Sequence, residues 1–285
     1  PTPNDGGSCP ECTGFPEEAA IVRTARHDFG LVVVAVSPKG DCWKKKRGYE
    51  IVPVLKQLAD EFSSNDQALP ILAFGASVGG GFVGDQLVAV MEQLERPLAG
   101  FIALCSRPQE PDPRPRKNKN GESKPVKYPV PVAVYLTMSK DYPSVNKAKK
   151  MVKSLTSDGL AALHLDLPPI AITDSFFYEH FLVSHLTLTK EQSTNMTQAL
   201  LKAGLLDDNR YLNFNPRTNT RWAAVIRPYA PPEDSLEIRR SPTVEVLNKA
   251  YGWHEMSRQG LHQGLAFILT EHEKRQSQLQ QAKEQ

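Results

Sequence analysis

A serine between closely spaced glycines is the residue whose sequence context indicates a catalytic role most directly. The segment Gly75-Ala76-Ser77-Val78-Gly79 follows an apolar stretch at residues 71–74 and leads into an apolar helical pattern. A strand that turns sharply into a helix at such a serine is a nucleophile elbow, which exposes the hydroxyl at the carboxyl edge of a sheet. The sequence therefore predicts that Ser77 is a nucleophile. The alternatives are a turn with an idle serine and, less well supported, a phosphate loop, because neither a Walker lysine nor G-x-G-x-x-G spacing is present.

A nucleophilic serine needs a base, and the base needs a carboxylate that orients it. At a nucleophile elbow the chain order is serine, then carboxylate, then histidine, with the carboxylate just past a later strand. Asp141 meets this condition, because it follows the apolar run at residues 132–136 and a short turn. Asp141 could instead cap the helix that is predicted to begin near Ser144. The competing carboxylates are Asp166 and Asp174.

The histidine is expected in the loop before the last helix. His254 fits this place, within Tyr251-Gly252-Trp253-His254-Glu255. His180 is an alternative base, because it lies nearer in sequence to the last predicted strand. For His262 and His272, which lie inside the predicted final helix, a solvated or core role is the preferred interpretation. His185 lies with His180 in a helical insertion.

Short apolar runs alternate with helical patterns over residues 1–168. Continuous apolar, β-branched runs of about four to eight residues are typical of strands buried on both faces of a parallel sheet. The alternation predicts an α/β domain with a mostly parallel, doubly wound sheet and helices on both faces. We predict strands at residues 31–36, 70–74, 98–104, 130–136 and 161–167, and helices at residues 16–27, 49–62, 78–94 and 144–157.

The alternation stops after Pro168-Pro169. We predict that residues 169–240 form a mostly helical cap insertion, and that residues 241–285 return to the core with a final helix and a tail that frays beyond Lys274. The aromatic side chains of this part have two interpretations: they line an apolar acyl pocket, or they pack the cap onto the sheet. These residues are Phe176, Phe177, Phe181 and Trp253.

Composition narrows the range of functions. Hydrophobic residues make up 40% and charged residues 23% of the chain, and the formal net charge is +2, so nothing demands nucleic acid or an anionic membrane. No stretch approaches the roughly 18–20 apolar residues of a transmembrane helix. We expect a soluble protein that acts on a small ester or acyl compound without a metal or cofactor, and organellar and secretory compartments would both fit.

The four cysteines favour no metal site. Cys9 and Cys12 form a C-x-x-C pair, but zinc would need two more ligands at suitable spacing, and no second C-x-x-C is present. A disulfide or unpaired loop cysteines is the preferred interpretation, and the state of Cys42 is left open. Cys105 ends an apolar run, so we expect a buried thiol.

An acyl-transfer site also needs donors for the oxyanion. The backbone N–H of Val78, directly after the serine, is the first predicted donor. A second donor normally comes from a loop after an early strand that often carries His-Gly. No apolar strand precedes residues 1–14, so Gly6 and Gly7 are the remaining candidates, and the sheet is expected to lack its first strands.

Several segments give the chain a resemblance to a group of largely uncharacterised α/β-hydrolase-superfamily proteins of plants and algae. The resemblance implies an α/β-hydrolase fold with a triad of Ser77, Asp141 and His254, and it implies no particular substrate. The chain departs from the superfamily pattern by lacking the upstream strand and the His-Gly segment. The segments that carry the resemblance are Cys9-Pro10-Glu11-Cys12-Thr13-Gly14-Phe15-Pro16-Glu17-Glu18, Gly75-Ala76-Ser77-Val78-Gly79-Gly80, Tyr135-Leu136-Thr137-Met138-Ser139-Lys140-Asp141 and Glu245-Val246-Leu247-Asn248-Lys249-Ala250-Tyr251-Gly252-Trp253-His254-Glu255.

The combined expectation is a serine hydrolase of the carboxylesterase, lipase or thioesterase kind that cleaves a carboxylic ester or thioester through an acyl-enzyme on Ser77. Two alternatives remain open. The chain could be a catalytically inactive α/β-hydrolase-fold subunit of a larger assembly, which uses its cap and the basic loop at residues 107–127 as contact surfaces. It could also transfer the acyl group to an acceptor other than water.

Overall fold

The computed structural model describes residues 15–36, 48–62, 69–93, 98–106, 131–184, 186–237 and 241–284. The chain divides into two compact units that alternate along the sequence. None of the helices in these ranges combines the length and the apolar character that crossing a membrane requires. The first unit comprises Pro1–Ser37, Met138–Tyr142 and Asp166–His262, and the second comprises Pro38–Thr137, Pro143–Leu165 and Gln263–Gln285.

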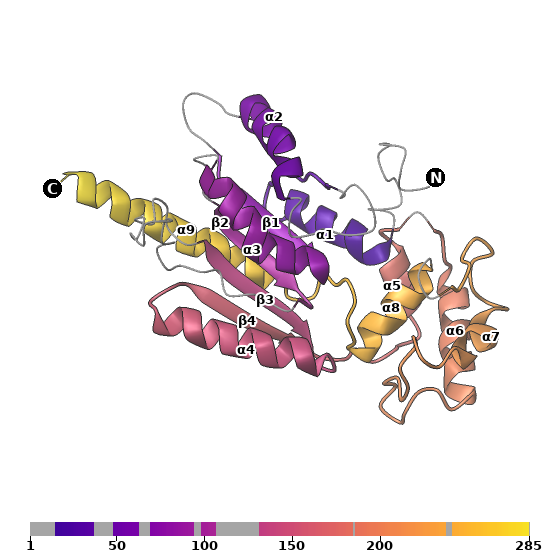
Figure 1. Ribbon diagram of the computed structural model, residues 1–285. Coiled ribbons are helices and arrows are strands. Elements are labelled where there is room, and N and C mark those ends of the chain that lie inside the picture. Colours follow the sequence, from indigo (N-terminus) through magenta and orange to yellow (C-terminus); the bar gives the residue numbers. More distant parts are fainter. Residues whose placement is uncertain are drawn as a thin grey trace. The chain divides into compact units, whose positions relative to one another are not determined.

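A parallel sheet is the centre of the second unit (Figure 1). Its neighbouring strands β1 and β2 pair in parallel, and so do β2 and β3. Every residue of β2 and β3 is buried, as the continuous apolar runs predicted, whereas most residues of β1 and β4 at the two edges are only partly buried. The predicted α/β class with a parallel sheet is therefore confirmed. In order across the sheet, the four strands of the described residues are β1 (Ile71–Ala76), β2 (Leu98–Leu104), β3 (Val132–Met138) and β4 (Ala162–Leu167).

Helices account for most of the remaining regular structure. In chain order they are α1 (Pro16–His27), the 3-10 turn η2 (Gly48–Ile51), α2 (Val52–Phe62), α3 (Val78–Gln93), α4 (Tyr142–Ser157), α5 (Phe176–Phe181), α6 (Lys190–Lys202), α7 (Arg221–Ile226), α8 (Pro242–Tyr251) and α9 (Leu261–Glu284).

Helices α3 and α9 cover opposite faces of the sheet in the second unit. Gly84 of α3 lies against the ring of Phe101, whereas Gly264 of α9 lies against the side chain of Ile102. Successive side chains of a strand point to opposite faces, so these two contacts are made on different sides of β2. Figure 1 shows the two helices on either side of the strands.

The prediction of a strand at residues 31–36 is wrong. This run has no regular secondary structure, and the side chains of Val32 and Val34 are 60% and 45% exposed. A strand needs a neighbour that takes up its backbone hydrogen bonds. No strand of the described part of the chain pairs with this run, so its apolar composition alone does not produce a strand.

The final helix differs from the prediction at its C-terminal end. Helix α9 begins at Leu261, so His254 lies in the loop that precedes it, as expected, whereas α9 runs past Lys274 to Glu284 instead of fraying. The tail is rich in good helix formers such as Gln, Lys and Glu. An ion pair between Lys274 and Glu271, with a distance of 2.7 Å, adds local support within the helix.

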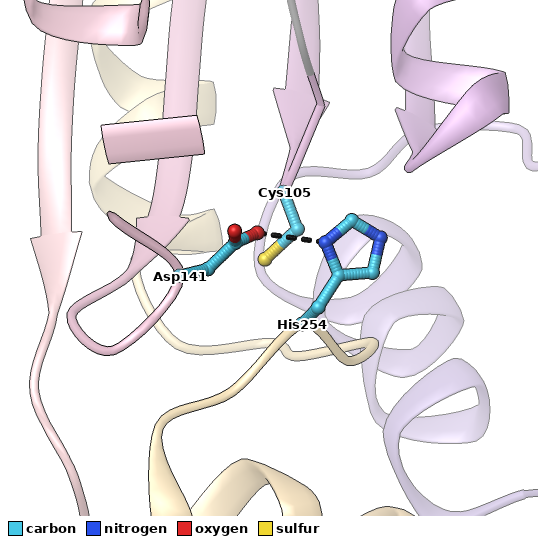
Figure 2. A group of neighbouring side chains, drawn as sticks. All are labelled: Cys105, Asp141 and His254. Carbon is cyan, nitrogen blue, oxygen red and sulfur yellow. Dashed lines mark hydrogen bonds and ion pairs between the residues drawn. The ribbon is translucent and has the colours of Figure 1, made fainter. Parts of the chain in front are cut away.

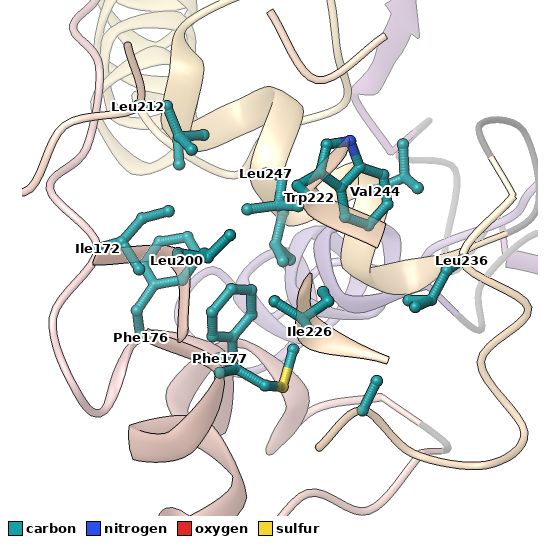
Figure 3. Packing of buried hydrophobic residues seen from close by; sticks show 14 of the residues in the cluster. Ile172, Phe176, Phe177, Leu200, Leu212, Trp222, Ile226, Leu236, Val244 and Leu247 are labelled. Atoms are coloured by element: carbon teal, nitrogen blue, oxygen red, sulfur yellow. The ribbon is translucent and has the colours of Figure 1, made fainter. Parts of the chain in front are cut away.

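A separate hydrophobic core stabilises the first unit (Figure 3). Trp222 is fully buried within it, and its indole N–H donates to the carbonyl of Pro216 at 3.0 Å. Phe176, Phe177 and Phe181 belong to the same core and are 2%, 0% and 3% exposed. These three rings therefore pack within the core of the first unit.

Candidate active site

Ser77 occupies the tight turn that joins β1 to α3 in the second unit. Its backbone has a φ of 53°, in the left-handed region that non-glycine residues rarely adopt. The Ser77 N–H donates to the carbonyl of Leu104 at 2.8 Å, and the Ser77 carbonyl accepts from Gly81 N at 3.2 Å. The chain thus leaves the sheet and enters the helix at this residue, and the side chain of Ser77 is exposed, as expected of a nucleophile elbow.

Two glycines make this turn possible. A Cβ atom on Gly75 would overlap the backbone of Gly79, and a Cβ on Gly80 would lie 2.6 Å from the Cβ of Ser106. The close approach of strand and helix therefore excludes any side chain at these two positions. In contrast, a Cβ on Gly81 would meet nothing within 4 Å. Of the two glycines of the motif, Gly75 thus has a steric cause at the turn, whereas a Cβ on Gly79 would also meet nothing within 4 Å.

Val78 is the first residue of α3, so its N–H belongs to the first turn of the helix. The N–H groups of a first turn have no acceptor within their own helix, and together with the helix dipole they favour an anion. Val78 is therefore suitably placed in its helix for the predicted oxyanion role. The proposed second donors, Gly6 and Gly7, lie outside the described residues, as do Cys9, Cys12 and Cys42.

Asp141 and His254 form a hydrogen-bonded pair in the first unit. Nδ1 of His254 lies 2.7 Å from Oδ2 of Asp141, as Figure 2 shows. The Asp141 side chain is 7% exposed and the His254 side chain 33% exposed. Because an ionised carboxylate only accepts hydrogen bonds, Nδ1 carries the proton opposite it, and Nε2 is the nitrogen that can act as a base. Cys105, which is also drawn in Figure 2, belongs to the other unit, where it is buried as predicted.

The backbone holds the two partners together. Asp141 lies three residues past β3, in a turn that its N–H closes on the carbonyl of Met138 at 2.9 Å. The adjacent Lys140 N–H donates to the carbonyl of Gly252 at 2.9 Å, two residues before His254. Gly252 ends α8 with a φ of 79°, and a Cβ there would lie 3.1 Å from the Pro169 ring. The left-handed conformation therefore favours glycine at this position, and a side chain there would also press against the Pro169 ring.

His180, the alternative base, belongs to a buried ionic cluster instead. Its Nδ1 lies 2.7 Å from the carbonyl of Phe176, and its Nε2 lies 3.0 Å from Nζ of Lys249. Lys249 in turn forms a buried ion pair of 2.6 Å with Glu17. Burial, reinforced by the charge of Lys249, lowers the pKa of His180 to about 4. His180 is therefore a neutral, structural imidazole with both ring nitrogens engaged.

The other candidates have partners of their own. Asp166 accepts from the hydroxyl of Ser139 at 2.9 Å. Asp174 pairs with Arg210 at 2.6 Å, and this hydrogen bond is the main reason that the pKa of Asp174 is lowered. His262 packs against the Phe29 ring, with 4.8 Å between centroids, and His185 lies outside the described residues. Among the described candidates, His254 and Asp141 form the carboxylate–imidazole hydrogen bond.

Sequence reasoning missed Arg217, whose Nη2 donates to the backbone carbonyl of His254 at 2.7 Å. An arginine in an irregular segment has no periodicity or motif that could have identified it. Comparison of the chain with known protein families, with characterised proteins and with solved structures found no match. The chemical interpretation therefore depends on the geometry within each unit and on the sequence motifs.

Proposed function

We propose that the protein is a serine hydrolase that cleaves a carboxylic ester or thioester through an acyl-enzyme on Ser77. The observation that carries this proposal is the 2.7 Å hydrogen bond between His254 and Asp141, two residues 113 positions apart in the chain. A carboxylate that orients an imidazole through Nδ1 fixes the tautomer in which Nε2 is the basic nitrogen. The elbow at Ser77 is the second support, because it presents an exposed serine hydroxyl at the start of a helix.

The proposed reaction proceeds in two halves. The Ser77 Oγ attacks the carbonyl carbon of the substrate while Nε2 of His254 takes the hydroxyl proton, and the N–H of Val78 donates to the oxyanion. The tetrahedral intermediate collapses, and the imidazolium returns its proton to the departing alcohol or thiol. Water then attacks the acyl-enzyme with His254 again as base, which releases the carboxylic acid and restores Ser77. Asp141 keeps the imidazole in the required tautomer throughout.

Backbone strain at Ser77 is consistent with this role. A non-glycine residue held at positive φ costs on the order of 1–3 kcal/mol and persists only where the surrounding structure enforces it. Here the close packing at Gly75 and Gly80 enforces it. A strained conformation that the fold maintains at an exposed polar residue is typical of sites where the side chain must be presented in one direction.

Covalent labelling tests the proposal directly. Folded protein should react with a fluorophosphonate probe, and mass analysis should place the adduct on Ser77. The Ser77→Ala variant should lose both labelling and hydrolysis of short p-nitrophenyl esters, whereas Ser157→Ala, at an exposed serine within α4, should retain both. His254→Gln should label far more slowly. Labelling that survives Ser77→Ala would refute the assignment, and no labelling of folded protein would favour an inactive subunit.

A further inference from the structure

We propose that Arg217 is a positioning residue for His254, which it holds through the His254 backbone carbonyl and the Glu255 carboxylate. The inference rests on the proposed function, because it concerns the histidine that would act as base. Every contact that carries it lies within the first unit. Arg217 does not touch the reacting atoms in this proposal and acts only through the loop that bears the imidazole.

The contacts form a clamp around one peptide. Nη2 of Arg217 donates to the His254 carbonyl at 2.7 Å and to Oε2 of Glu255 at 2.8 Å. Oε2 of Glu255 also accepts from the Asn248 amide at 2.8 Å, and Oε1 accepts from the N–H of Met256 at 3.1 Å. Helix α8, which contains Asn248, and Arg217 therefore hold the segment from His254 to Met256 from two separate parts of the chain.

The loop needs such a clamp because it has no hydrogen-bond ladder of its own. Residues 253–260 lie between the end of α8 and the start of α9 and have no helix or strand. Their position therefore depends on contacts with side chains and with neighbouring turns. On the proposed mechanism the imidazole must meet the serine hydroxyl and the leaving group in turn, and a misplacement of about 1 Å can reduce the rate about 100-fold.

Arg217 is itself firmly placed. Its N–H donates to the Asn215 side chain at 3.0 Å, and the carbonyl of the preceding Pro216 accepts from the indole of Trp222 at 3.0 Å. Trp222 is fully buried in the core of this unit. The guanidinium thus extends from a rigid base to the His254 loop, which is what a positioning residue requires.

Steady-state kinetics separate positioning from a general effect on folding. Arg217→Met should lower kcat by about 10- to 100-fold while KM changes little, because the substrate contacts remain and the base is displaced. Arg217→Lys should recover part of kcat, since its ammonium keeps the charge and the donors but lies on a shorter side chain without the planar guanidinium. Arg210→Met is the matched control, because Arg210 forms a comparable, partly exposed ion pair with Asp174 in the same unit. It should keep the wild-type kcat.

A spectroscopic readout distinguishes failure of this inference from failure of the proposed function. The proton held between His254 and Asp141 in a short charge-assisted bond should give a strongly deshielded ¹H resonance in the wild type and in Arg210→Met. Arg217→Met should broaden or abolish the resonance. If the wild type hydrolyses no ester but the resonance is lost in Arg217→Met, positioning stands and the proposed function falls. Wild-type kcat or an unchanged resonance in folded Arg217→Met would overturn the inference.

Glu255→Gln provides a second variant in case Arg217→Met does not fold. It removes the carboxylate half of the clamp and leaves the Arg217 bond to the His254 carbonyl. A severalfold loss of kcat with a broadened His254 resonance would support the proposal. Wild-type kcat and a sharp resonance in folded Glu255→Gln would overturn it.

Discussion

Replacing Glu245 by glutamine should stabilise the protein at neutral and alkaline pH. Glu245 lies in α8 and is only 4% exposed, and its Oε2 accepts from the N–H of Glu17 at 3.1 Å. Its Oε1 and the Oε2 of Glu18 are both buried and find no donor among the described residues. A hydrogen bond between the two carboxyls satisfies both oxygens only if one of them holds a proton.

The native protein holds that proton on Glu245. Burial, followed by the hydrogen bond to Glu18 and its charge, raises the pKa of Glu245 from 4.5 to about 11, and burial also raises the pKa of Glu18. The unfolded chain releases the Glu245 proton above about pH 4.5, so folding must recover it. Because the folded pKa is the higher one, the contribution of Glu245 is fully present below pH 4.5 and is lost as the pH rises toward 11.

The size of the pH-dependent change in stability follows from the uptake of one proton on folding. Stability falls by about 1.4 kcal/mol per pH unit within the window, which amounts to about 3 kcal/mol between pH 6 and pH 8. A glutamine at position 245 keeps an acceptor for the Glu17 N–H and a donor for Glu18, and it has no proton to recover. The free energy of unfolding of Glu245→Gln relative to wild type should therefore increase by about 3 kcal/mol over these two pH units.

Urea unfolding followed by tryptophan fluorescence and circular dichroism at pH 6, 7 and 8 measures this difference. Glu233→Gln is the control, because Glu233 is exposed, and its pH dependence should follow that of the wild type. A difference between Glu245→Gln and wild type that does not change with pH would show that Glu245 is not protonated in the native state. That result would refute the assignment of a shared proton between α1 and α8.

Two further predictions concern packing. Gly75→Ala should destabilise the protein by about 1–3 kcal/mol or more in thermal unfolding, because its methyl group has no space against the backbone of α3, whereas Gly81→Ala faces open space and should cost nothing. Equal melting temperatures for the two variants would contradict the steric account of the elbow. Leu200→Ala, in the core of the first unit, should cost about 2–5 kcal/mol, and the same change at Leu201, which is 37% exposed, should cost far less. Equal losses would contradict the assignment of Leu200 to that core.

Local pattern in the sequence was sufficient to locate most of the elements. The strand at Leu98–Leu104 and the helix at Pro16–His27 agree with the predicted bounds, because a continuous apolar run and a proline-started amphipathic pattern are local signals. The run at residues 31–36 has the same composition as a buried strand. Whether a run forms a strand depends on a partner elsewhere in the chain, which the run itself does not encode.

Some residues of the candidate site could likewise be predicted from local sequence patterns, whereas others could not. Glycine spacing identified the turn at Ser77, and the expected order of carboxylate and histidine identified Asp141 and His254. Arg217 acts on a backbone carbonyl 37 residues away, and Lys249 pairs with Glu17 across 232 residues. Every residue has a backbone carbonyl, so the residue type at position 254 does not indicate that its carbonyl accepts a hydrogen bond from Arg217. Such a contact can be identified only from the tertiary structure.

The burial of helix α8 limits which amino-acid substitutions this protein can tolerate. Each of its nine residues from position 242 to position 250 is buried, including Glu245, Asn248 and Lys249. A surface helix normally keeps one face where substitutions are neutral, but α8 has no such face before Tyr251. Its apolar positions are restricted by shape and its polar positions by their buried partners. A saturation mutagenesis scan should therefore find almost no tolerated change in the helix that leads to His254, and broad tolerance in the last turns of α9.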